Sequence, residues 1–168
     1  KFYPTICYKT PYIINYNEIY DKGYRGILID IDNTLVEHGA PATLESDNFF
    51  EELRSNGFTT CIISNNSEER VRPFAESSKS LYIFNAGKPG VKSYIKGMEL
   101  MGTDRNNTLF IGDQMFTDIF GANKTGIRSI LVEPVKMDRK FFIMLKRAGE
   151  AIVKKFYLRY AIRHPEEL

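Results

Sequence analysis

Ile27-Leu28-Ile29-Asp30-Ile31-Asp32-Asn33-Thr34-Leu35 places three apolar residues directly before two carboxylates and a hydroxyl. A short apolar run without polar alternation is typical of a strand buried on both faces, as in a parallel sheet covered by helices. Asp30 and Asp32 would then lie at the carboxyl end of that strand, the edge where open α/β sheets bind ligands. Side chains two residues apart in an extended chain share a face, so both carboxylates can converge on one group. The alternative is a plain strand followed by an Asp-Asn turn, because Asp and Asn bond readily to their own backbone.

Apolar runs alternate with helical patterns along the rest of the chain. We predict strands over 26–31, 59–64, 81–84, 108–111 and 127–132, and helices over about 44–55, from 67 onward, 91–101 and 116–123. This alternation predicts a five-stranded parallel sheet with right-handed crossovers and helices on both faces. About thirty residues separate the first two strands, which leaves room for one crossover helix and no cap domain. Residues 1–24, with a short helix near 16–22, are expected to pack across the sheet.

The bulk composition is that of an ordinary globular protein. We expect the 168 residues to form a single domain, 1–168, with its core over about 25–133. Cys7 and Cys61 make no disulfide framework, which favours a reducing, intracellular compartment. No apolar run approaches the ~18 residues of a membrane span. Tyrosine and proline interrupt the first residues, so we expect no secretory signal.

The positive charge is concentrated near the carboxyl terminus. Residues 136–163 carry nine Lys or Arg against Asp138 and Glu150, a net +7 that leaves −5 on the remainder. Apolar residues recur at helical spacing there, which predicts a basic amphipathic helix over about 137–162. This helix would either dock its apolar stripe on the domain or lie on an anionic membrane. Binding of nucleic acid by the same basic face is the least favoured alternative.

Polar side chains of different kinds follow the first four predicted strands. Asp30 and Asp32 come first, then Ser64, then Lys88, then Asp113. Polar residues are common where strands end, but a carboxylate pair, a hydroxyl, an ammonium and a further carboxylate in succession are much less common by chance. The carboxyl ends of parallel strands meet at one edge of the sheet, so we expect these side chains to form one site.

Phosphoryl transfer is the chemistry that needs this combination. A phosphate ester is an anion that repels a carboxylate nucleophile, and Mg²⁺, which takes oxygen ligands, removes the repulsion. Asp30 and Asp113 would supply two carboxylate ligands, and the backbone carbonyl of Asp32 a third. Lys88 and the Ser64 hydroxyl would balance the charge on the transferring group. A carboxylate nucleophile would form an aspartyl-phosphate, and Asp32 lies where a general acid/base is required.

Four motifs carry a resemblance to a known family. Asp30–Leu35 has the pattern DxDxT, and Ser64-Asn65, Lys88 and Gly112-Asp113 with Asp118 follow in order. Over about residues 26–132 the chain thus resembles the haloacid dehalogenase-like (HAD) phosphohydrolases, which implies a Rossmannoid α/β fold. The resemblance implies Asp30 as nucleophile and Asp32 as general acid/base, the latter being similar to the phosphatase pattern. It implies that Ser64 and Asn65 bind the phosphate and that Lys88 is the charge clamp. It also implies Asp113 as a metal ligand, with Asp118 and Thr34 as supporting residues.

A narrower resemblance concerns three segments. Residues 112–123, 64–66 and 70–75 are similar to the capless YqeG-type branch, which includes mitochondrial and cyanobacterial phosphatidylglycerophosphate phosphatases. The resemblance implies a Mg²⁺-dependent phosphomonoester hydrolase of the cytoplasm or mitochondrial matrix. Its narrowest form converts phosphatidylglycerophosphate to phosphatidylglycerol, with peripheral membrane contact through the carboxyl-terminal helix. The alternatives are a phosphatase of a soluble nucleotide or sugar phosphate, and a non-catalytic HAD-like binding module, which the intact acidic and lysine set disfavours.

Other polar residues near these motifs have two interpretations each. A solvated helix face is favoured for Arg70 and Arg72 over contact with a second anionic group of the substrate. An exposed loop is favoured for Glu37 and His38 over contact with the leaving group. Lys88-Pro89 also occurs in response-regulator receivers, but the acceptor aspartate follows a later strand there, so a receiver is disfavoured.

Overall fold

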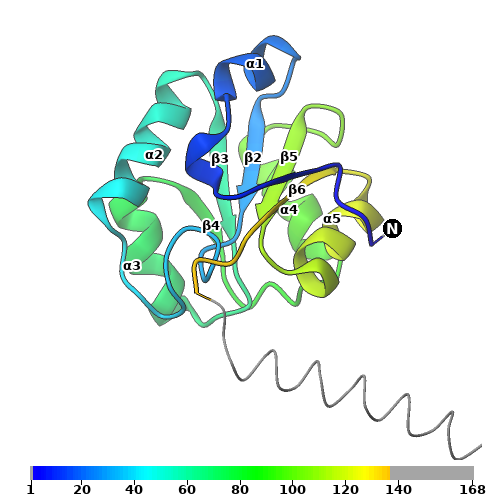
Figure 1. Ribbon diagram of the computed structural model, residues 1–168. Helices are drawn as coiled ribbons and strands as arrows, with labels where there is room; N and C mark the ends of the chain where they lie inside the picture. The colour runs from blue at the N-terminus through cyan, green and yellow to red at the C-terminus, as the bar shows by residue number, and fades with distance from the viewer. Residues whose placement is uncertain (1, 137–168) are drawn as a thin grey trace, which may run out of the picture. The chain divides into compact units, whose positions relative to one another are not determined.

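A six-stranded parallel sheet runs through the computed structural model, which describes residues 2–136 (Figure 1). The strands lie in the order β1-β6-β5-β2-β3-β4, and β2 is central between β5 and β3. The residues up to Val135 form one compact unit. The bounds of the strands are β1 (Ile6–Tyr8), β2 (Gly26–Ile29), β3 (Thr59–Ile63), β4 (Leu81–Ile83), β5 (Thr108–Gly112) and β6 (Arg128–Val132).

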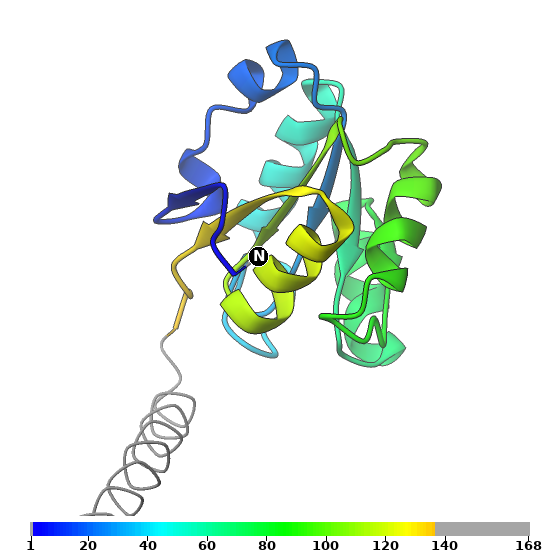
Figure 2. The ribbon, with the colours of Figure 1, turned by 90° about the vertical axis from the view of Figure 1, so that its right-hand side faces the viewer.

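Helices cover both faces of the sheet (Figures 1 and 2). On one face, Ile27 and Ile29 of β2 share a core with α2 (Leu44–Ser55) and α3 (Glu68–Ser78). On the other face, Leu28 of β2 packs with α4 (Lys92–Met101) and α5 (Phe120–Thr125). Successive side chains of a strand point to opposite faces, so one unbroken apolar run supplies both cores. The predicted α/β fold with helices on both faces is confirmed, and α2 is the one described helix between β2 and β3.

The predicted count of five strands is wrong, because β1 adds a sixth at the edge beside β6 (Figure 2). Ile6 to Tyr8 pair with Ile130 to Val132, and the Thr5 N–H donates to the Ser129 carbonyl at 2.9 Å. Without β1, the N–H and C=O groups along this side of β6 would lack ladder partners. Pairing at an edge depends on a distant strand, so the three residues of β1 carry no local signal. The 3₁₀ turn η1 (Pro11–Ile13) and helix α1 (Tyr16–Asp21) follow.

The segment after β5 also differs from the prediction of one helix over 116–123. It begins as a π-helical turn, η2 (Met115–Ile119), and continues as α5. The Ile119 N–H bonds to the carbonyl of Gln114, five residues earlier, at 3.2 Å. Such turns inside helices occur frequently at functional sites. By contrast, α2 has the predicted bounds, and the side chains of Thr43 and Ser46 cap its start reciprocally.

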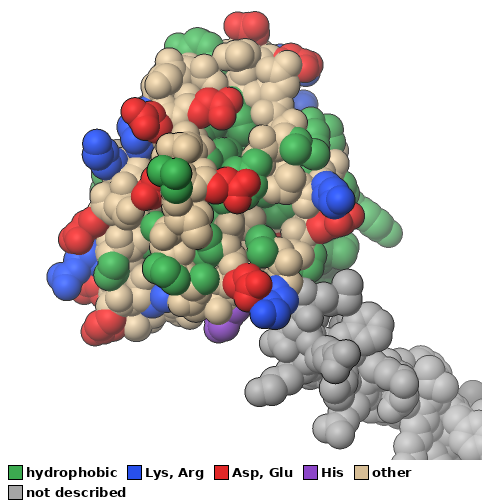
Figure 3. Space-filling model, turned by 60° about the vertical axis from the view of Figure 1, so that its left-hand side comes forward, with side chains coloured by type: hydrophobic (Ala, Val, Ile, Leu, Met, Phe, Trp, Pro, Cys, Tyr) green, Lys and Arg blue, Asp and Glu red, His purple; other side chains and the backbone are tan. Residues whose placement is uncertain are grey.

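The surface of the described residues shows no concentration of one kind of charge on the face drawn in Figure 3, where acidic, basic and hydrophobic side chains are interspersed. Among residues 2–136, no helix combines the length and apolar character needed to cross a bilayer. The predicted basic helix over 137–162 lies outside the described residues.

Candidate active site

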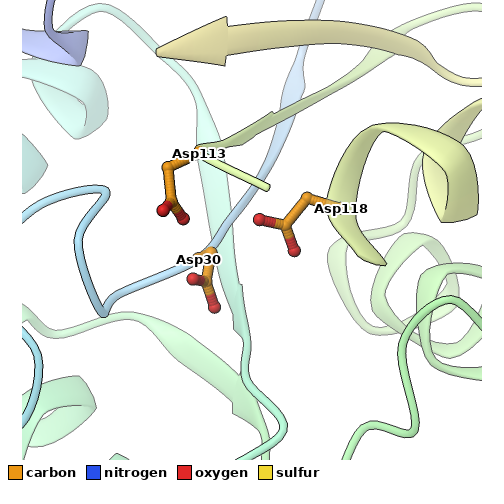
Figure 4. A group of neighbouring side chains, drawn as sticks. All are labelled: Asp30, Asp113 and Asp118. Carbon is orange, nitrogen blue, oxygen red and sulfur yellow. The ribbon is translucent and has the colours of Figure 1, made fainter. Parts of the chain in front are cut away.

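Three carboxylates meet at the carboxyl edge of the sheet. Asp30 follows β2, Asp113 follows β5, and Asp118 is presented by η2 (Figure 4). One oxygen of each lies within 4.8 Å of the other two. The pairing of Ile29 with Ile111 explains the approach of Asp30 to Asp113, because neighbouring parallel strands end side by side. A cluster of this kind needs positive charge close to it.

Lys88 supplies one positive charge. Its Nζ lies 2.7 Å from Oδ1 of Asp30 and 2.7 Å from Oδ1 of Asp118, and only 4% of its side chain is exposed. Burial alone would lower the pKa of Lys88, but the two carboxylates outweigh burial and raise it, so the ammonium stays charged. Asn65 holds the Lys88 backbone from both sides: its Oδ1 accepts the Lys88 N–H at 2.8 Å, and its Nδ2 donates to the Lys88 carbonyl at 3.2 Å.

Negative charge remains in excess around Lys88. Burial raises the pKa of Asp30 to about 6, although Lys88 opposes the shift. Burial, followed by the charges of Asp118 and Asp30, raises the pKa of Asp113 to about 7, against a hydrogen bond of 3.2 Å from Thr34 Oγ1. The cluster is therefore three buried or half-buried carboxylates against one ammonium. An all-oxygen donor set of this charge fits a hard divalent cation.

Asp32 faces a different set of partners. Its Oδ1 accepts the Gly39 N–H at 2.8 Å and Arg70 Nη2 at 2.9 Å, and its Oδ2 accepts a short hydrogen bond from Asn66 Nδ2. The same Asn66 nitrogen donates to Ser64 Oγ at 3.2 Å. Asn66 thus connects the residue predicted as acid/base with the hydroxyl predicted to bind phosphate.

All eight residues predicted for the site lie at the carboxyl ends of the strands or in the segments that follow them. Contacts connect them in two groups. The first is the charged cluster, with its supporting residues: Asp30, Asp113, Asp118, Lys88, Thr34 and Asn65. The second joins Asp32 to Ser64 through Asn66. The carboxylate of Asp32 is not part of the acidic cluster. A metal contact through the Asp32 backbone carbonyl stays a prediction, as does the chemical role of each of the eight residues.

Arg70 is the residue that sequence reasoning underestimated. The prediction of a solvated helix face is wrong for this residue, because its guanidinium lies 2.9 Å from Asp32 Oδ1 and 2.7 Å from the carbonyl oxygen of Ala40. Its position held a signal: it lies in the first turn of α3, and a helix that follows β3 directly begins at the edge of the sheet that carries the site. Arg72 is exposed as expected, near Glu76. The exposed His38 ring lies 4.0 Å from Asp32 Oδ2.

Comparisons with known proteins agree with this geometry. A family model described as HAD-hydrolase-like matches residues 85–140. "Probable phosphatase YqeG" of Bacillus subtilis strain 168 is 35% identical over 150 residues, which cover 89% of this chain and 87% of that protein. Among solved structures, a Vibrio cholerae protein assigned as a 3-deoxy-D-manno-octulosonate 8-phosphate phosphatase has a TM-score of 0.55 at 18% identity, covering 71% of each chain. An uncharacterized protein from Corynebacterium glutamicum has a TM-score of 0.54 at 16% identity, covering 76% of this chain and 94% of its own.

These comparisons carry different conclusions. The solved structures share the fold of this chain. The 35% identity to YqeG extends over most of both proteins. The chain therefore belongs to the haloacid dehalogenase-like (HAD) superfamily, as a phosphatase of that superfamily.

Proposed function

We propose that the protein hydrolyses a phosphomonoester with the help of Mg²⁺, through an aspartyl-phosphate on Asp30. The observation that supports this most is the setting of the Asp30 carboxylate. It lies at the end of the central strand, 2.7 Å from the buried Lys88 ammonium and beside Asp113 and Asp118. A carboxylate nucleophile surrounded by other carboxylates repels a phosphate unless a cation is bound beside it. The oxygens of the acidic cluster are ligands that suit such a divalent cation.

The groups we assign to Mg²⁺ are the carboxylates of Asp30 and Asp113 and the backbone carbonyl of Asp32. When bound, the ion would offset the repulsion between the nucleophile and the phosphate. Asp118 would hold Lys88, from which it is 2.7 Å away. Thr34 would orient Asp113 through its hydroxyl, and the hydrogen bonds of Asn65 would fix the backbone of Lys88. A phosphate contact of Asn65 would then come from its main chain.

The chemical steps use groups of this chain. An oxygen of Asp30 attacks phosphorus while the bond from phosphorus to the leaving oxygen breaks, and Asp32 gives that oxygen a proton. Lys88 and the Ser64 hydroxyl balance the charge of the transferring group. Water then attacks the phosphorus of the aspartyl-phosphate, and the Asp32 carboxylate takes the proton of that water. Inorganic phosphate leaves, and the Asp30 carboxylate is restored.

As substrate we propose a lipid phosphate, phosphatidylglycerophosphate in particular. Met115 and Phe116 are exposed on η2, the same turn that presents Asp118 to Lys88. Apolar side chains at this position suit an amphiphilic ester whose headgroup enters the site while its acyl chains stay in a bilayer. The basic residues within 136–163 would add attraction to an anionic membrane. A soluble nucleotide or sugar phosphate would leave the exposed apolar surface of Met115 and Phe116 in water.

Phosphate release tests the activity. With p-nitrophenyl phosphate, we expect turnover that needs Mg²⁺, stops with a chelator, and is abolished by Asp30→Asn. Asp21→Asn, an exposed aspartate at the end of α1, is the matched control and should keep full activity. Turnover by Asp30→Asn at the wild-type rate would reject the aspartyl-phosphate, and an inactive wild type would favour the binding module.

A substrate panel tests the lipid assignment. Phosphatidylglycerophosphate in mixed micelles should give a higher kcat/KM than nucleotide and sugar phosphates. Replacing Met115 and Phe116 together by glutamine should lower kcat/KM for the lipid, while turnover of p-nitrophenyl phosphate stays unchanged. Equal or better turnover of a soluble phosphate would replace the lipid by that substrate class.

A further inference from the structure

We infer that Arg70 is a positioning residue for acid catalysis: it holds the Asp32 carboxylate and the loop after β2 in the arrangement that the leaving group requires. This inference rests on the proposed function and adds to it a residue on α3. It starts from the contacts of one guanidinium nitrogen, Arg70 Nη2.

Arg70 joins two segments that lie far apart in the sequence. Its Nη2 is 2.9 Å from Asp32 Oδ1 and 2.7 Å from the carbonyl of Ala40, while its backbone belongs to the first turn of α3. Its side chain is only 20% exposed, and its guanidinium carbon lies over the Phe74 ring, 5.7 Å from the ring centre. One nitrogen thus connects the Asp32 carboxylate with the loop that follows β2.

The contacts divide the two oxygens of Asp32. Arg70 and the Gly39 N–H both donate to Oδ1, whereas Asn66 donates to Oδ2, near the exposed His38 ring. Two donors, one of them a guanidinium, favour the negative charge on Oδ1, so we assign the proton of the acid to Oδ2. Asn66, which also contacts Ser64 Oγ, places Oδ2 on the side of the predicted phosphate binder. Arg70 therefore helps, together with the Gly39 N–H and Asn66, to fix the rotation of the Asp32 carboxylate about its Cβ–Cγ bond.

Loss of this hold has a specific signature. A misplaced acid slows the departure of a poor leaving group, such as an alkoxide, which needs a proton as its bond to phosphorus breaks. p-Nitrophenolate leaves without that proton. The ratio kcat/KM reports the steps up to cleavage of this bond, and its change for the two kinds of substrate separates acid positioning from a general loss of structure.

The experiment compares Arg70→Met with wild-type protein on an alkyl phosphate and on p-nitrophenyl phosphate. We expect kcat/KM to fall about 100-fold for the alkyl ester and by no more than about threefold for the aryl ester. Arg72→Met, two residues along α3 with an exposed side chain, is the matched control and should change neither. Arg70→Lys keeps the charge but not the fork of donors, so it should recover part of the alkyl activity. It also serves if Arg70→Met does not fold.

Other outcomes overturn the inference. An equal fall in kcat/KM for both esters would make Arg70 a structural residue. A rise in KM confined to substrates with a second anionic group, with kcat unchanged, would make it a substrate contact. Wild-type protein that hydrolyses neither ester would reject the proposed function itself, which is a different result from an active wild type with an insensitive Arg70.

Discussion

Replacing Gly112 with alanine inserts one methyl group between β5 and the acidic cluster. A Cβ at Gly112 would lie 2.5 Å from Oδ2 of Asp118 and 2.8 Å from both its Cβ and its Cγ. Ordinary contact begins at 3.4 Å, so Asp118 would have to retreat by roughly 0.6–0.9 Å. Oδ1 of the same carboxylate is 2.7 Å from Lys88, and Oδ2 accepts the Gln114 N–H at 3.1 Å. The retreat therefore loosens the partner that holds Lys88.

The size of the effect follows from that displacement. Overpacking a filled site costs about 1–3 kcal/mol of the free energy of unfolding. A displacement approaching 1 Å in the machinery of an active site costs about 100-fold in rate. We therefore expect Gly112→Ala to remain folded at 25 °C and to lose most of its phosphatase activity. Urea denaturation measures the first quantity, and the rate of phosphate release from p-nitrophenyl phosphate measures the second.

Gly97→Ala is the matched control. A Cβ at Gly97, inside α4, would lie 2.7 Å from Leu28 Cδ2 and 3.3 Å from Ile63 Cδ1, so it also overpacks the core. It does not touch the acidic cluster, and we expect a comparable loss of stability with activity largely kept. If Gly112→Ala were as active as Gly97→Ala, the proposed dependence of the activity on the position of Asp118 would be refuted.

Three further predictions concern charge and support in the same cluster. Lys88→Met leaves Asp30 and Asp118 without their ammonium, so phosphatase activity should vanish. In urea denaturation at pH 8 the variant should lose about 3–5 kcal/mol of the free energy of unfolding. The loss should be smaller at pH 5, where protons neutralise the two carboxylates, and a loss independent of pH would contradict this. The folded-state pKa of Asp113, about 7, exceeds its ordinary value of 3.8. The folded metal-free protein therefore binds more protons than the unfolded chain, and its free energy of unfolding should decrease as the pH rises from about 4 to 7. A divalent cation should accordingly raise Tm more at pH 8 than at pH 5, and an equal rise at both would argue against a metal at this cluster. Asn65→Ala removes both hydrogen bonds to the Lys88 backbone, which should cost about 1–3 kcal/mol in urea denaturation and about tenfold in phosphate release; unchanged turnover would leave Asn65 no positioning role.

Much of the site could be predicted because its residues follow the strands directly. In a parallel sheet, the end of each strand is fixed relative to its neighbours, so a polar residue at that point has a predictable place. Asp30 and Asp113 are of this kind, and they meet as expected. Lys88 lies five residues beyond the end of β4, and it reaches Asp30 from a loop whose backbone Asn65 holds. Arg70 is not of this kind, because it extends from a helix, and the direction of a long side chain depends on what surrounds it.

The fold shows the same division. The apolar runs predicted five strands and the helices between them, because burial on both faces leaves a local record in the sequence. The strand β1 has only three residues, and its pairing with β6 is decided by a neighbour more than a hundred residues away. The π-helical turn η2 depends on hydrogen bonds to Gln114 that a helical pattern alone does not reveal.

The sequence by itself determined the order of the parallel α/β elements, the family, and the identity of the charged residues at the strand ends. Only the tertiary structure decided the strand order, the ion pairs of Lys88 with Asp30 and Asp118, and the ion pair between Arg70 and Asp32. The physical reason is the range of the interactions. Hydrophobic periodicity is imposed by the geometry of a single element, whereas an ion pair forms wherever packing brings two charges within reach.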